Sequence, residues 1–146
     1  MVALLTAMFT SVSAVVIRVP KMYMFGFAAS FNDSIVHFTR IQTVDSVSID
    51  HKTKLMTGRE NYSYQLRDYL ATQNMPHRTC VVFYNQDRKK IEKQYLKMKR
   101  IYTLGTKKVR KKIKQGVKIN SYDIRNLTTE EFQFHTVDMS DVVYDM

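Results

Sequence analysis

The sequence predicts an α+β domain: a single mixed or antiparallel sheet with two helices packed on it, in the order βββαβαβ(β). The chain has 146 residues, which suits one domain. It is 45% hydrophobic with four Gly and two Pro, which favours a real core and argues against disorder. Aromatic-rich extended segments come first, and helical periodicity follows. We expect the domain over residues 22–138, after a leader over 1–21 and before an acidic tail over 139–146.

The leader contains an uncharged apolar stretch, residues 2–17. This stretch is shorter than the roughly 20 residues of a membrane span, so it resembles the apolar region of a signal peptide. Val12-Ser13-Ala14 fits a cleavage site. However, no Lys or Arg precedes the stretch, while Arg18 and Lys21 follow it, which opposes export.

Three interpretations of the leader therefore stay open. A cleaved signal peptide would place the protein in the periplasm or cell envelope, with no transmembrane helix in the mature domain. A true start at Met22 or Met24 would make it cytoplasmic. In the third interpretation, Leu4 to Val19 forms a helix or strand of the fold itself.

The first strands are predicted by alternation. Aromatic side chains alternate with small ones and Met along residues 23–31, which indicates a strand. Asn32-Asp33 predicts a tight hairpin turn, and the return strand is expected over residues 34–41. A third strand is expected over residues 44–49 and a polar loop over 50–58.

Two helices are predicted on either side of a buried strand. Asn61 is expected to cap the first helix, which ends near Gln73 before Pro76. Residues 78–84 are apolar and β-branched, which is typical of a strand covered on both faces. A second helix should run from a cap at Asn85 or Asp87 to Tyr102, with an apolar face formed by Ile91, Tyr95, Met98 and Tyr102.

The remaining elements are short. Residues 104–116 contain two Gly and six basic residues and are interpreted as an exposed loop, followed by a strand over 117–124. Thr128 and Glu131 form a capping box. A short alternating piece over residues 132–135 follows.

Charge is concentrated in one segment. Residues 88–118 hold 14 Lys and Arg and one acid, while the rest of the chain holds 9 basic and 12 acidic residues. The basic segment could simply be a solvated surface, or it could bind an anion. The candidate anion-binding residues are Lys99, Arg100, Lys107, Lys108, Arg110, Lys111, Lys112 and Lys114.

The partner depends on the compartment. An exported protein would present these cations to an anionic surface, a lipid headgroup or an acidic glycan, and a cytosolic one to nucleic acid. Tyr95 and Tyr102 could stack on bases, although their place on the apolar helix face favours the core. No RNA- or DNA-recognition motif is present.

No catalytic, metal or cofactor motif is found. Cys80 lies in an apolar run and is expected to be a buried hydrophobe. The four His have no metal-ligand spacing, so no metal and no cofactor are expected. An enzyme with an unrecognised site that involves His37, His77 or Asp50 remains an alternative.

Three stretches carry a resemblance: residues 22–34, 64–70 and 75–80. Behind a hydrophobic leader, they resemble a group of small uncharacterised exported bacterial proteins. The resemblance implies an envelope location and no particular activity. The sequence thus predicts a small exported or envelope-associated binding or structural domain, with a cytosolic nucleic-acid-binding protein and an enzyme as alternatives.

Overall fold

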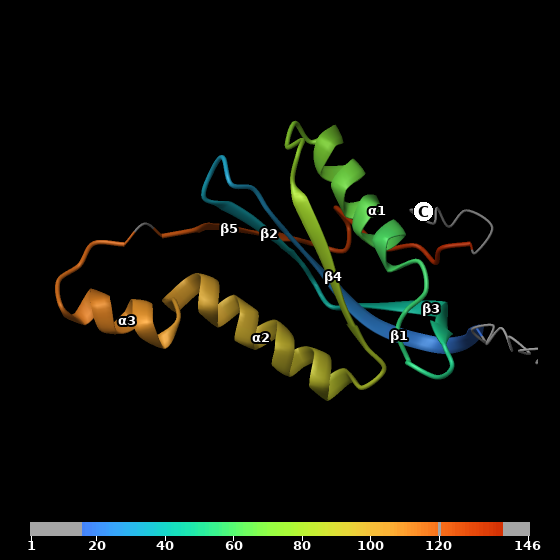
Figure 1. Ribbon diagram of the computed structural model, residues 1–146. Helices are drawn as coiled ribbons and strands as arrows, with labels where there is room; N and C mark the ends of the chain where they lie inside the picture. The colour runs from blue at the N-terminus through green and yellow to red at the C-terminus, as the bar shows by residue number, and fades with distance from the viewer. Residues whose placement is uncertain (1–15, 120, 139–146) are drawn as a thin grey trace, which may run out of the picture.

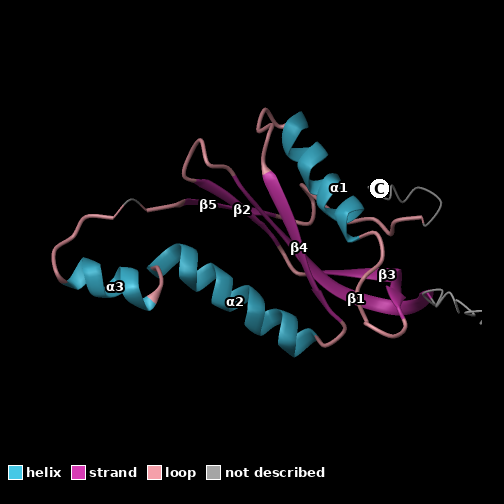
Figure 2. Cartoon of the chain, viewed as in Figure 1, coloured by secondary structure: helices cyan, strands magenta, loops and turns pink. Residues whose placement is uncertain are grey.

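The computed structural model describes residues 16–119 and 121–138 and confirms the α+β class (Figures 1 and 2). Five strands form one mixed sheet. The elements are β1 (Val16–Ala29), β2 (Ile35–Thr39), β3 (Gln42–Asp50), α1 (Arg59–Thr72), β4 (Thr79–Asn85), α2 (Arg88–Leu104), α3 (Lys107–Lys114) and β5 (Asp123–Leu127).

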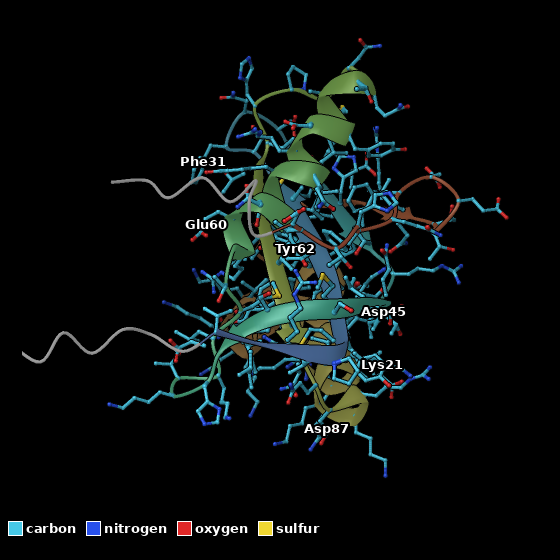
Figure 3. The ribbon with its side chains drawn as sticks, turned by 90° about the vertical axis from the view of Figure 1, so that its right-hand side faces the viewer. Lys21, Phe31, Asp45, Glu60, Tyr62 and Asp87 are labelled. Carbon is cyan, nitrogen blue, oxygen red and sulfur yellow. The ribbon has the colours of Figure 1, made fainter. Side chains whose placement is uncertain are left out.

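The central strand of the sheet is β1. Antiparallel β3 pairs with its first half, from Val16↔Asp50 to Met24↔Gln42, and antiparallel β2 pairs with its end. Antiparallel β4 covers its other side, and β5 lies parallel to β2. The predicted hairpin joins β1 to β2, but the connection spans residues 30–34 instead of a tight turn at Asn32-Asp33, and neither of these residues has a positive φ. Figure 3 shows Lys21 and Asp45, which are register partners, side by side on β1 and β3.

The alternation of β1 sends its side chains to two separate cores. Phe25 and Phe27 pack in one core with Ile91 of α2, whereas Met22 and Met24 pack in the other with α1. The two predicted helices therefore cover opposite faces of the sheet, as Figure 1 shows. In Figure 3, Tyr62 lies between α1 and the sheet; its side chain is buried.

A bulge separates β2 from β3. Between the pairs Met24↔Gln42 and Phe27↔Phe38, β1 has two residues and its partner has three, so one residue is extra. At the bulge the Thr39 side chain takes the place of a backbone acceptor, because its Oγ1 accepts a hydrogen bond of 2.8 Å from the Gly26 N–H. Gly26 is required by space: a Cβ would lie 2.7 Å from Leu66.

Two predictions about helices were wrong. The first helix begins at Arg59 rather than Asn61, because Gly58 adopts a left-handed φ of 72° and supplies the N-cap position without a side-chain bond. The predicted loop over 104–116 contains α3. Its two glycines flank the helix: Gly105 is the C-cap of α2 and Gly116 follows the C-cap of α3, both at positive φ.

The last strand also differs from prediction. β5 is Asp123–Leu127, where residues 117–124 were expected to be extended. The capping box is confirmed, since the Thr128 N–H and the Glu131 N–H each donate to the other residue's side chain at 3.3 Å. Residues 132–135 form no strand, but their alternation holds: Phe132 and Phe134 are buried in the α1 core.

The burial of β4 and the start of β1 also differ from prediction. β4 is an edge strand in which only Val82 is fully buried, so its two faces are less covered than its apolar composition indicated. β1 begins at Val16, seven residues before the predicted Tyr23, so Val16–Val19 belongs to the fold.

The proposed cleavage site at residues 12–14 lies outside the described residues. Within the described ranges, no helix is long and apolar enough to span a membrane.

Candidate anion-binding surface

The candidate surface is built on α2. The Asp87 side chain caps this helix by accepting a hydrogen bond of 2.9 Å from the Lys89 N–H, as predicted. The predicted apolar face packs on the sheet: Tyr95 meets the Phe25 ring edge-on at 5.1 Å, and Tyr102 lies 4.9 Å from Phe27. Both tyrosines are half-buried and pack against the core of the sheet. The other side of α2 carries exposed cations.

A short amphipathic helix, α3, continues the surface. Thr106 caps it, with Oγ1 accepting a 3.3 Å hydrogen bond from the Val109 N–H. Val109 and Ile113 are one turn apart and line the same hollow beside the end of α2. The basic residues occupy its remaining positions. In Figure 1, α3 stands at the end of α2, away from α1.

Lys99 differs from the other seven candidates. Its ammonium group lies 5.1 Å from the centre of the Phe38 ring and 5.4 Å from that of Tyr95, and it donates a hydrogen bond to Asn126 Oδ1. Partial burial lowers the pKa of Lys99. Lys99 therefore joins α2 to the sheet and is not available for an anion on the outer surface.

Four cations instead share one hollow of about 310 Å³ between α2 and α3. It is lined by Lys97, Arg100, Lys107 and Arg110. A second hollow of about 290 Å³ continues along α3 and adds Lys111 and Lys114. Lys97 was not among the candidates, although its spacing of three residues from Arg100 places both on one helix face.

Among the described residues, no acid forms a salt bridge with the cations of the two hollows. The single acid of the basic segment, Glu92, pairs with Arg88 at 2.9 Å near the start of α2. Over residues 16–119 and 121–138, none of the cations that line the two hollows forms a salt bridge. Lys108 and Lys112 are exposed on α3 as well. The surface therefore keeps its positive potential.

Exposed aliphatic side chains border these cations. Ile101 lines the first hollow with them, and it shares a further hollow, between the end of α2 and α3, with Leu104, Ile113 and Ile119. Each of these four side chains is between 38% and 52% exposed. A solvated basic surface has no need of them, because exposing apolar area to water costs free energy. The arrangement suits a partner that offers both negative charge and apolar groups.

A second polar cluster lies where the hairpin meets β4. The guanidinium of Arg78, whose side chain is 4% exposed, forms a two-point ion pair with Asp33 and donates a 2.9 Å hydrogen bond to the Ile35 carbonyl. This hydrogen-bonded arginine lowers the pKa of the Asp33 carboxyl. Burial lowers the pKa of His37 nearby. The ion pair locks the hairpin onto β4.

The suggested catalytic residues are not gathered in one place. His37 lines a small pocket between α1 and β5, but neither His77 nor Asp50 lines it. The Asp50 carboxylate accepts hydrogen bonds from the Lys52 and Thr53 N–H groups and thereby shapes its own loop. Among the described residues, no group of three or more His, Cys, Asp or Glu could hold a metal ion.

Cys80 has the environment of a structural thiol. Burial raises its pKa to about 11, so its thiolate is scarce at neutral pH. This differs from the lowered pKa that a nucleophilic cysteine needs.

The surface of α2 and α3 is therefore the best candidate site.

Comparison of the chain with protein-family models, with curated proteins and with solved structures finds no match.

Proposed function

We propose that the protein is a binding domain that docks on anionic lipid surfaces through α2 and α3. The observation that carries the proposal is the place of exposed aliphatic residues, such as Leu104 and Ile113, beside a row of cations that form no salt bridge with any described acid. Basic residues are attracted by anionic headgroups, and aliphatic side chains gain by entering the boundary between headgroups and acyl chains. The proposal assigns no catalytic step to the domain.

Nucleic acid fits this surface less well. Its binding rests on phosphate contacts and on aromatic stacking, and neither makes use of exposed Ile, Leu or Val. The rings of Tyr95 and Tyr102 pack on Phe25 and Phe27 of the sheet.

The proposal includes a location at the cell envelope. Cleavage after Ala14 would leave the whole of β1 in the mature chain. A start at Met22 would remove residues 16–21, which pair with β3 from Val16↔Asp50 to Lys21↔Asp45. The structural role of these residues supports a mature chain that retains them. The resemblance to small exported bacterial proteins agrees with this location.

The proposal is tested by vesicle flotation. Neutral phosphatidylcholine vesicles are compared with vesicles that contain phosphatidylglycerol. The protein should float only with the anionic vesicles, and less at high salt. Three Gln substitutions, at Lys107, Arg110 and Lys111, should weaken binding by on the order of 100-fold, because each cation near the surface contributes about 1 kcal/mol.

A matched control removes three charges elsewhere. Lys52, Lys54 and Arg59 are exposed and lie outside the basic segment. Changing them to Gln should leave most of the binding intact. Equal losses for both triple variants would reject a specific surface. Tight binding of a short duplex or single strand, without binding to vesicles, would favour the nucleic-acid alternative.

A further inference from the structure

A mainly apolar hollow lies beside the β1–β2 hairpin. It has a volume of about 300 Å³, and its lining combines Phe27, Val36, Val81 and Tyr102 with the polar Ser30, Asp33 and Thr79. Phe31 flanks it from the tip of the hairpin and is fully exposed, as its position at the margin of the fold in Figure 3 illustrates.

A second, mainly apolar hollow lies next to the first. It has a volume of about 290 Å³, lies between the end of α2 and α3, and shares Tyr102 and Tyr122 with the first hollow. The rings of these two tyrosines meet edge-on at 4.9 Å. Leu104, Val109 and Ile113 line its other side. The two hollows therefore lie side by side and share the wall that Tyr102 and Tyr122 form, and we name the two together the apolar path.

The apolar path ends at the cations. The second hollow shares Ile101, Gly105 and Thr106 with the hollow that Lys97 and Arg100 line. Polarity therefore changes across three neighbouring hollows, from aromatic and aliphatic side chains near the hairpin to positive charge between α2 and α3. A ligand that matches it must be apolar along its length and anionic at one end.

We propose that this path binds one single-chain anionic amphiphile, with the chain along the two apolar hollows and the headgroup between α2 and α3. The inference rests on the proposed lipid-surface function and deepens it, because it adds a site for an individual lipid molecule. Apolar hollows with a few polar groups that fix orientation are typical of such ligand sites. Charge at one end of the path fixes the direction of the chain.

Calorimetric titration below the critical micelle concentration tests the inference, with dodecyl phosphate as the probe. We expect saturable binding with one molecule per chain. Each methylene removed, as in decyl phosphate, should weaken binding between twofold and fourfold, the upper value being that of full burial. Dodecyl maltoside, which has a neutral headgroup, and inorganic phosphate, which has no chain, should each bind at least about tenfold more weakly.

A pair of variants locates the chain. Ile113→Gln places a polar group in the path and should weaken dodecyl phosphate binding by about tenfold. Leu96→Gln is the control, because Leu96 is exposed on α2 but lines none of the four hollows. Both positions are exposed, so both variants should keep the circular dichroism spectrum of the parent chain.

The outcomes separate this inference from the proposed function. Flotation with anionic vesicles but no saturable binding of dodecyl phosphate would overturn the single-lipid site and leave surface docking in place. Loss of both activities would overturn both proposals. Equal weakening by Ile113→Gln and Leu96→Gln, or equal affinity for decyl and dodecyl phosphate, would also reject the apolar path as the chain site.

Discussion

The side chain of Gln42 holds the backbone of Phe134, which follows it by 92 residues. Gln42 Oε1 accepts a buried hydrogen bond of 2.7 Å from the Phe134 N–H, and Gln42 Nε2 donates one of 3.0 Å to the Phe132 carbonyl. One side chain thus replaces a strand partner. Gln65 makes the same two bonds to the backbone of His135, at 2.8 and 2.9 Å, in an exposed setting.

Gln42→Leu should therefore destabilise the fold by about 1–3 kcal/mol, because it leaves a buried N–H and a buried carbonyl without partners. The comparison variant is Gln65→Leu, which should cost less than about 1 kcal/mol because water can replace its exposed bonds. Urea unfolding of the two variants gives both free energies. Equal costs would contradict the argument from burial.

Local patterns in the sequence predicted most of the fold. The alternation around Phe25 and Phe27 indicated a strand, and this strand, the Asp87 cap and a hairpin between the first two strands are confirmed. The positions of the helices on opposite faces could not be predicted, since alternation within one strand does not say which element covers either face. β5 was misplaced because it is short, exposed and polar.

The candidate site was predicted in part. Charge density alone located the surface on α2 and α3. Charge density could not show that Lys99 differs from the neighbouring cations. Lys99 contacts the ring of Phe38 and the side-chain amide of Asn126, and both residues are distant from it in sequence. The helical state of α3 was missed because a run of Lys between two glycines is typical of a loop, whereas Gly105 and Gly116 flank a helix.

The ion pair between Asp33 and Arg78 predicts an acid-sensitive contribution to stability. The folded pKa of Asp33 is lowered below 3.8, so ionised Asp33 stabilises the fold fully above about pH 3.8, and this stabilisation is lost as the pH falls through the lowered value. Asp33→Asn should therefore be less stable than the parent chain at neutral pH, and the difference between their free energies of unfolding should shrink as the pH falls below about 3.8. Urea unfolding at neutral pH and below pH 3.8 measures this difference.

Asp68→Asn serves as the control for removal of one carboxylate, because Asp68 and its partner Arg67 are both exposed. Its gap from the parent chain should be small at both pH values. A gap for Asp33→Asn that stays constant on acidification would show that its carboxylate does not stabilise the fold through its charge.

Cys80 should react slowly in the folded protein. Its pKa rises from 9.0 to about 11, which reduces the thiolate fraction at neutral pH by about 100-fold, and the thiolate is the reacting species. Iodoacetamide should thus modify the folded chain about 100-fold more slowly than the chain in urea, as mass spectrometry over time would measure. A rate equal to that of the unfolded chain would contradict the burial of this thiol.

Removal of the first residues of β1 should destabilise the domain. A chain that starts at Val15 keeps every pair between β1 and β3, whereas one that starts at Met22 loses those from Val16 to Lys21 and the buried side chain of Val19. We expect a loss of at least about 3 kcal/mol, from apolar burial on both strands. Equal melting temperatures for the two chains would show that residues 16–21 are dispensable, and would favour a start at Met22.

The most direct test of lipid docking is to ask which face meets the bilayer. The slow reaction of Cys80 allows selective labelling of a new cysteine, introduced as Ile113→Cys on α3 or as Leu55→Cys in the exposed loop before α1. An environment-sensitive fluorophore at position 113 should shift to the blue on addition of phosphatidylglycerol vesicles, because it enters an apolar layer. The same fluorophore at position 55 should not shift. A shift at position 55 alone, or at neither position, would contradict docking through α2 and α3.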